Sequence, residues 1–266
     1  MESDKFVSVD TTARRTVVLT AVAAVTVVLS DTLVRWALSP LLGPLSALVL
    51  TILLFVVLVG VDARWGVAFG SLISGAAFGN WDAAVALSLA GFTATTVCAW
   101  LWADPDRNSV AWLGHYLGVV MLTAVTLGAM RALLADIFGL SPFWVTIAQS
   151  WAVLIPMSLL GIPIVWVASG RTVEQLSSGK RIQPPQRSRL LVSLIVLLWG
   201  MAGYLISFLF EALDLVPEFV VYQNLGEAVG TVVVTLASGN IAVTAVGVIA
   251  LVALSIVMHQ PRMNSR

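Results

Sequence analysis

The chain contains two long apolar stretches, LLVSLIVLLWGMAGYLISFLF at Leu190–Phe210 and IAVTAVGVIALVALSIVM at Ile241–Met258. Neither stretch contains Asp, Glu, Lys or Arg. A helix that crosses a bilayer needs about 20 mostly apolar residues, because backbone N–H and C=O groups must bond to one another where water is absent. Each stretch is therefore predicted to be a membrane-spanning helix, which places the chain among polytopic membrane proteins.

The same pattern fills the rest of the chain, where apolar stretches alternate with short polar hinges. The further predicted spans are Thr16–Val34, Gly43–Val61, Trp65–Asn80, Ala83–Trp102, Val110–Leu134 and Trp144–Val167. The composition agrees, since 59% of the 266 residues are hydrophobic and 11% are charged, whereas soluble domains carry roughly 25% charged residues. The predicted fold is an all-α transmembrane helical bundle of about eight spans, the last of which ends at Met258.

The distribution of Lys and Arg predicts the orientation, because basic residues close to helix ends stay on the cytoplasmic side. Eight spans with a cytoplasmic N-terminus leave only Arg35 and Arg131 outside and place the other 12 of the 14 basic residues inside. Both termini are therefore expected in the cytoplasm of a multi-pass protein of the cell membrane.

The chain is predicted to have three parts. Residues 1–167 form a six-helix membrane core, residues 168–189 a basic cytoplasmic linker, and residues 190–266 a two-helix membrane hairpin. The segment Gly226–Ala237 precedes the last span, and its apolar character fits either a re-entrant or an interfacial piece.

Tryptophan and glycine placement predicts how the helices sit and pack. Trp side chains prefer membrane interfaces, and seven of the ten lie near a predicted helix end: Trp36, Trp65, Trp81, Trp100, Trp102, Trp112 and Trp144. Small residues at four-residue spacing allow helices to approach closely. Such stripes are Gly66, Gly70 and Ser74, then Gly75 and Gly79, and finally Gly114 and Gly118. They are predicted packing surfaces or, alternatively, the wall of a cavity.

Polar side chains and one tryptophan within or beside the spans are the candidate ligand-binding residues, because polar groups are costly in a bilayer and often functional. The candidates are Asn80, Asp82, His115, Gln149 and Trp151. Asp82 has an alternative role as a helix N-cap, and His115 and Gln149 have one as groups that hydrogen-bond within the bundle.

Arg131 and Asp136 flank the predicted outer end of the fifth span. A long cationic side chain near a helix end can reach the interface while its stem stays in the apolar region. The sequence therefore predicts that Arg131 snorkels to the interface.

Missing motifs narrow the function. The sequence has no glycine loop ahead of a lysine, no paired aspartates and no serine–histidine arrangement, so no catalytic residue is assigned and an enzyme is unsupported. Two His and one Cys are too few for a haem pair or a zinc triad, so we expect no metal and no cofactor. The net charge of zero argues against nucleic acid as a partner.

The stretch Leu58–Trp102 joins a charged hinge, Asp62-Ala63-Arg64, to the glycine-rich Trp65–Asn80 and then to a helix of small residues. It resembles two families: an eight-helix class of membrane-associated sensor domains found ahead of histidine kinases, and the substrate-binding S components of energy-coupling factor transporters. The first resemblance implies eight spans with both ends inside, although no output domain follows Met258. The second implies a six-helix vitamin- or metal-uptake subunit, to which Leu190–Met258 would be an addition.

Two functions follow from these observations. The chain is predicted to be a membrane subunit that binds or transports a small solute, with partner subunits supplying energy because no motor motif is present. The alternative is a sensory, regulatory or structural module that acts through a partner protein. Both functions place the chain in a lipid bilayer with cytoplasmic or membrane partners, and neither identifies the ligand.

Overall fold

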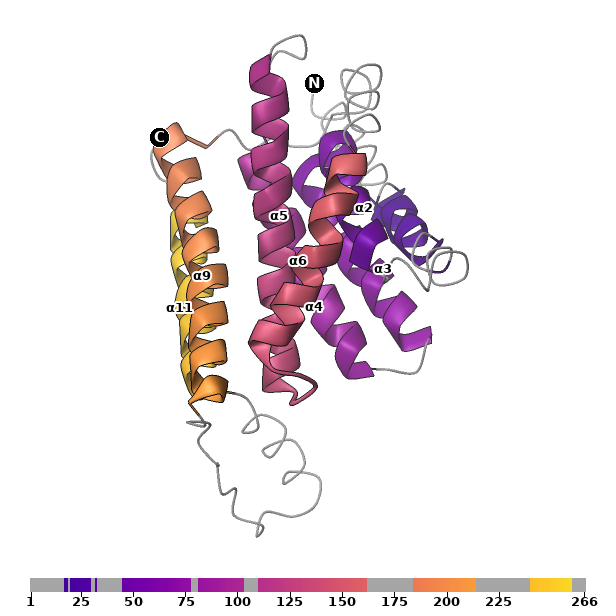
Figure 1. Ribbon diagram of the computed structural model, residues 1–266. Helices are drawn as coiled ribbons and strands as arrows, with labels where there is room; N and C mark the ends of the chain where they lie inside the picture. The colour runs from indigo at the N-terminus through magenta and orange to yellow at the C-terminus, as the bar shows by residue number, and fades with distance from the viewer. Residues whose placement is uncertain are drawn as a thin grey trace, which may run out of the picture. The chain divides into compact units, whose positions relative to one another are not determined.

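The computed structural model describes residues 17, 18, 20–29, 32, 45–77, 81–102, 110–161, 184–213 and 240–259. These residues form helices joined by turns, with no strand among them, which confirms the all-α prediction. Four helices are long and apolar enough to cross a membrane: α4 (Trp81–Leu101), α5 (Val110–Ile137), α9 (Gln186–Ala212) and α11 (Ile241–His259). The others are Thr20–Leu29, α2 (Leu45–Val59), the 3-10 turn η1 (Gly60–Asp62), α3 (Ala63–Ala77) and α6 (Phe143–Leu160) (Figure 1).

The chain divides into two compact units, which are described separately. Unit 1 comprises the described residues of Met1–Ala124 and Val153–Gln183, and unit 2 comprises those of Val125–Ala152 and Pro184–Arg266. The predicted three-part division of the chain stays a prediction. The segment Gly226–Ala237 lies outside the described residues.

In unit 1, α3 and α4 pack against each other as a helical hairpin. The contact is close because Gly75 has no side chain: a Cβ built there would lie 2.5 Å from the Cβ of Ala84. Helix α2 packs against both of them. It is joined to α3 through η1, which begins at Gly60 with a φ of 78°, a backbone conformation that glycine adopts without strain.

The glycine stripe of α3 packs against the helix Thr20–Leu29. A Cβ on Gly66 would lie 2.5 Å from the carbonyl oxygen of Thr20, and one on Gly70 would lie 2.7 Å from that of Ala24. The two backbones can approach this closely only without side chains at these positions. The structure therefore confirms Gly66 and Gly70 as packing residues.

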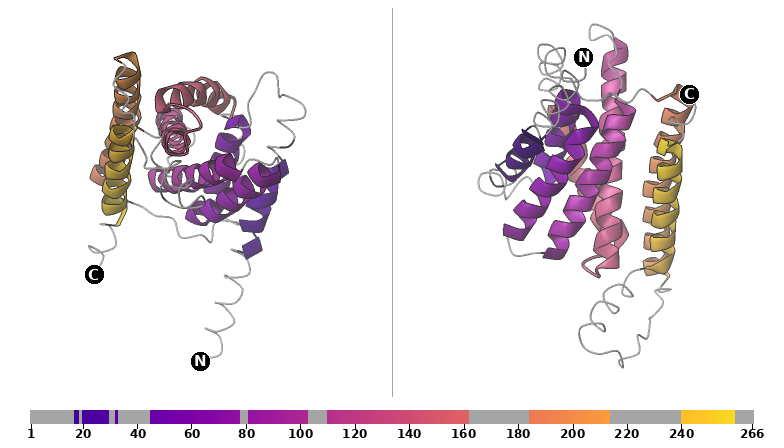
Figure 2. Two further views of the ribbon diagram at one scale, coloured as in Figure 1. Left: turned by 90° about the horizontal axis from the view of Figure 1, so that it is seen from below. Right: turned by 180° about the vertical axis from the view of Figure 1, so that it is seen from behind.

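Unit 2 contains the last part of α5, the first part of α6, and the helices α9 and α11. The pair α9 and α11 lie side by side in Figure 1 and in both views of Figure 2. Asp136, near the end of α5, accepts a hydrogen bond from the backbone N–H of Asn240, just before α11 (2.8 Å). The backbone N–H of Trp144, near the start of α6, donates to Ser207 near the end of α9 (3.3 Å). Successive helices of unit 2 therefore alternate in direction.

Helix α5 continues past its predicted end at Leu134 because its stop signal lies later. Gly139 takes a φ of 64°. Its N–H bonds the carbonyl of Asp136 (3.1 Å), and the N–H of Leu140 bonds that of Ala135 (2.8 Å). This is the pattern by which a glycine in the left-handed region closes a helix, and it keeps Asp136 in the last helical turn.

Helix α9 begins at Gln186, ahead of the predicted Leu190 and within the predicted linker. Pro185 precedes it in an extended conformation, and its carbonyl accepts hydrogen bonds from Ser188 (3.0 Å) and Arg189 (3.2 Å). A proline next to the first turn lacks only an N–H that the helix does not need. The residues that follow Pro185 are therefore helical even though they are polar.

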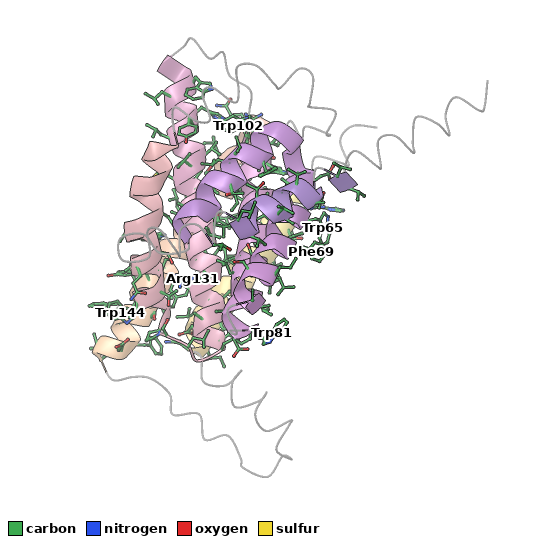
Figure 3. All side chains as sticks on the ribbon, turned by 90° about the vertical axis from the view of Figure 1, so that its right-hand side faces the viewer. Trp65, Phe69, Trp81, Trp102, Arg131 and Trp144 are labelled. Atoms are coloured by element: carbon green, nitrogen blue, oxygen red, sulfur yellow. The ribbon has the colours of Figure 1, made fainter. Side chains whose placement is uncertain are left out.

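Two of the Trp side chains predicted at interfaces lie in the protein core instead. Trp100 is 2% exposed, and Trp112 is 5% exposed with its ring stacked on Tyr116. Trp81 is 65% exposed, and Figure 3 shows it at one end of α4 with Trp102 at the other. A position near a helix end sets the depth of a residue but not the face from which its side chain projects. Trp36 lies outside the described residues.

We predict that Gly70→Ala lowers the thermal stability of the detergent-solubilised protein. The new methyl group would lie 2.7 Å from the Ala24 oxygen and 2.7 Å from the Val27 Cβ, and such overpacking typically costs about 1–3 kcal/mol. Gly118→Ala is the matched control, because no described atom lies within 4 Å of a Cβ there and alanine favours a helix. Equal melting temperatures for the two variants would contradict the packing described above.

Candidate functional site

Of the predicted ligand-binding residues of unit 1, Asp82 and His115 are described, and they lie at opposite ends of α4. Asn80 lies outside the described residues. Asp82 is exposed in the first turn of α4, where its charge complements the helix dipole. His115 is half-buried and packs edge-on against Trp102, just beyond the other end of α4, with ring centroids 6.0 Å apart. Asp82 and His115 are thus separated by the length of α4, about 30 Å at 1.5 Å per residue.

The predicted residues of unit 2 also differ from each other. Gln149 is exposed on α6, whereas Trp151 is half-buried. Residues two apart on a helix do not face each other, so these side chains project in different directions. Of the pair, only Trp151 points into the packed interior of unit 2.

Arg131 also points into that interior. It lies about 9 Å before the end of α5 at 1.5 Å per residue. Its Nη1 donates a hydrogen bond to the Ser150 hydroxyl (3.1 Å), and Ser150 lies about 10 Å beyond the start of α6 by the same rise. The Cα–Cβ bond tilts toward the N-terminus of a helix, so the side chain leads away from the nearer end of α5.

The predicted snorkelling of Arg131 stays a prediction, and the structure shows its side chain bonded to α6. Figure 3 shows Arg131 farther from the α5–α6 turn than Trp144. Within the described residues the Arg131 side chain bonds Ser150, and no carboxylate pairs with it. The Ser150 oxygen accepts from Arg131 through a lone pair, while its own O–H donates to the Thr146 carbonyl (2.7 Å). The hydroxyl is uncharged, so it does not neutralise the guanidinium.

Trp151 lies against two glycines of neighbouring helices. A Cβ on Gly128 of α5 would lie 3.1 Å from the indole Nε1 and 3.3 Å from the Cβ of Ser150. A Cβ on Gly200 of α9 would lie 3.2 Å from Cζ2 of the same indole. The indole therefore fills a space that exists because both helices carry glycine there.

The Trp151 indole N–H is buried and has no acceptor among the described residues. Gly128 lies three residues before Arg131, so both are on one face of α5, and long helical side chains lean over the preceding turn. Ser150 and the indole N–H thus both lie against Gly128, and the guanidinium is bonded to Ser150. We call Arg131, Ser150 and Trp151 the donor cluster.

The donor cluster offers hydrogen-bond donors but little for bond-making chemistry. A guanidinium carries several N–H donors and no acceptor, and an indole carries a single donor. The one hydroxyl, on Ser150, already makes two hydrogen bonds. The cluster presents positive charge, hydrogen-bond donors and an aromatic ring.

Asp136 fixes the helix ends beside the donor cluster. Its carboxylate accepts hydrogen bonds from the backbone N–H groups of Phe143, the first residue of α6, and Asn240. Asn240 in turn caps α11, since its side-chain oxygen accepts from Ala242 (3.0 Å) and Val243 (3.3 Å). One negative charge thus stands at the positive ends of two helices.

A second tie joins α6 to α9 at the same end of unit 2. The Trp144 indole N–H donates to the carboxylate of Glu211, and Gly203 lies against the Phe143 ring. Sequence inspection identified Trp144 as an interfacial residue but gave no signal for these partners, which lie more than sixty residues away along the chain.

The sequence does not predict that the residues of the donor cluster lie together. Arg131 lies three residues before the predicted end of a span at Leu134, a position that predicts an interfacial side chain. Gly128 and Gly200 lie in different helices, so only the fold brings them both against Trp151.

The chain matches no protein-family description, no curated protein and no solved structure.

We predict that Asp136→Ala destabilises the protein by about 1–3 kcal/mol, because two backbone N–H groups lose a charged acceptor. Asp136→Asn keeps one acceptor oxygen and should be intermediate. Asp82→Ala is the control, since the exposed Asp82 should contribute no more than about 1 kcal/mol through the helix dipole. Thermal unfolding in detergent measures all three variants, and an Asp136→Ala protein as stable as Asp82→Ala would contradict the role of Asp136.

Proposed function

We propose that the chain is a multi-pass protein of the cell membrane with eight spans and both termini in the cytoplasm. The four long apolar helices and the concentration of 12 of the 14 basic residues on one side support this topology. The alternating directions of α5, α6, α9 and α11 within unit 2 are consistent with it.

We further propose that the protein binds a small solute at the donor cluster, as a transport or uptake subunit that relies on partner subunits for energy. The observation that carries this proposal is an arginine directed into the helical unit without a described carboxylate, beside a buried indole N–H without a described acceptor. Ionisable groups in membrane helices that face the interior commonly mark solute pathways. Buried donors also favour a bound acceptor, because an unsatisfied polar group is costly there.

The aromatic ring gives the solute a surface to pack on. Trp151 packs against Gly128 of α5 and Gly200 of α9, so its orientation is set before a ligand arrives. A site whose side chains are already in place loses little entropy on binding. The donor cluster therefore combines a fixed ring with directed donors, as small-molecule sites generally do.

The topology is testable by cysteine labelling. Cys98, the one cysteine, is buried, so Cys98→Ser provides a background for single cysteines at exposed Leu140, in the α5–α6 turn, and at exposed Arg187. We predict that a membrane-impermeant maleimide labels Leu140→Cys on intact cells and labels Arg187→Cys only after lysis. The reverse pattern would overturn the orientation.

The binding function is testable by thermal shift of the purified full-length protein across a panel of carboxylates, phosphates, amines, sugars and vitamins. A ligand at a hundred times its Kd stabilises a protein by about 2.7 kcal/mol. We predict that at least one solute raises the melting temperature. Trp151→Phe, which removes the N–H but keeps a ring, should weaken that solute about tenfold or more.

Trp199→Phe is the matched control for this experiment. Trp199 is 2% exposed, lies in the same unit and also has a buried indole N–H without a described acceptor. Solute affinity should survive its replacement. A panel without any stabilising solute, or equal losses in the two variants, would overturn the proposed function.

A further inference from the structure

The donor cluster carries one positive charge. Arginine stays protonated in proteins, and the Arg131 guanidinium lies at the depth of Ser150, about 10 Å from the start of α6 at 1.5 Å per residue. A charge at membrane depth is costly unless it is paired. The carboxylate nearest along α5, that of Asp136, is directed to the N–H groups of Phe143 and Asn240.

The groups around this charge are donors. The Ser150 oxygen already accepts from Arg131, and its proton is used on Thr146. The indole N–H of Trp151 lies against the same glycine, Gly128, without a described acceptor. A cationic or purely donating solute would meet repulsion and no acceptor here, whereas an oxyanion would accept from both the guanidinium and the indole.

The number of charges limits the ligand further. A guanidinium binds a carboxylate or a phosphate with two parallel hydrogen bonds. One guanidinium neutralises one negative charge, so a doubly charged group would leave an unpaired charge at this depth. Resting on the proposed function, we propose that the donor cluster binds the singly charged oxyanion of its solute, a carboxylate or a phosphodiester.

Two sources supply such a group, and two arms of one experiment separate them. The soluble arm compares octanoate with octanamide, its neutral counterpart of similar size, by thermal shift of the full-length protein. The lipid arm compares protein reconstituted in phosphatidylglycerol with protein in phosphatidylcholine. Stabilisation by octanoate alone identifies a soluble carboxylate, and stabilisation by phosphatidylglycerol alone identifies a lipid headgroup; either result supports the proposal.

Variants assign the charge preference to Arg131. We expect Arg131→Gln to abolish the preference for the anion and to weaken anion affinity at least about tenfold. Arg131→Lys should retain part of it, because it keeps the charge but not the planar fork. Arg189→Gln is the control, since Arg189 also belongs to unit 2 but lies in the first turn of α9, and it should leave the preference unchanged.

Other results of these experiments would contradict the proposal. Equal shifts with octanoate and octanamide, together with equal stability in the two lipids, would overturn the proposal even if Arg131→Gln fails to fold, because wild-type protein alone gives this result. An anion preference that survives Arg131→Gln would also overturn it. Stronger binding of octyl phosphate, which carries nearly two charges at neutral pH, would contradict the restriction to one charge.

The test separates this inference from the proposed function. If a neutral or cationic solute binds and depends on Trp151 while no anion does, the binding function stands and the anion assignment fails. If no solute of any charge binds, both fail together.

Discussion

A polar group within a bilayer must find its partner in the protein, and this constraint organises the described parts of the chain. Several hydroxyl groups meet it locally, since Thr95, Thr123 and Ser150 each donate to the carbonyl four residues earlier in their own helix. Asp136 and Arg131 instead have their partners in other segments of the chain. Asp136 bonds the backbone of two other segments, and Arg131 reaches across to α6.

Glycine makes these long-range contacts sterically possible. Without side chains at Gly128 and Gly200, α5 and α9 both come into contact with Trp151, and without one at Gly203, α9 approaches the ring of Phe143. A bilayer supplies no hydrophobic force between helices, so such close backbone contacts provide much of the packing energy. The residues that hold unit 2 together therefore also set the position of the donor cluster.

The fold class and most helix positions could be predicted because they depend on local properties of the sequence. Apolar length predicted α9 and α11, and the glycine spacing of α3 predicted a packing face that Gly66 and Gly70 confirm. Helix ends were harder to predict where a single residue determines the boundary. Gly139 extends α5 beyond Leu134, and Pro185 starts α9 among polar residues.

The candidate site was harder to predict because the position of a residue along a helix does not determine which neighbours its side chain meets. Gln149 and Trp151 were selected together, yet one is exposed and the other is half-buried. Arg131 lies near a helix end, which suggested an interfacial side chain, but its hydrogen bond to Ser150 leads it inward. Asp136 finds its partner Asn240 far along the chain, a pairing that only the tertiary structure supplies.

The central claim is that the Arg131 guanidinium lies inside the helical unit beside Ser150. Solid-state NMR on the protein in bilayers tests it most directly, through the dipolar coupling between guanidino-¹⁵N arginine and ¹³Cβ serine, with Ser150→Ala as the reference. The account predicts a close ¹⁵N–¹³C contact in the wild-type protein that disappears in Ser150→Ala. Identical couplings in the two samples would contradict it, since the guanidinium would then lie elsewhere.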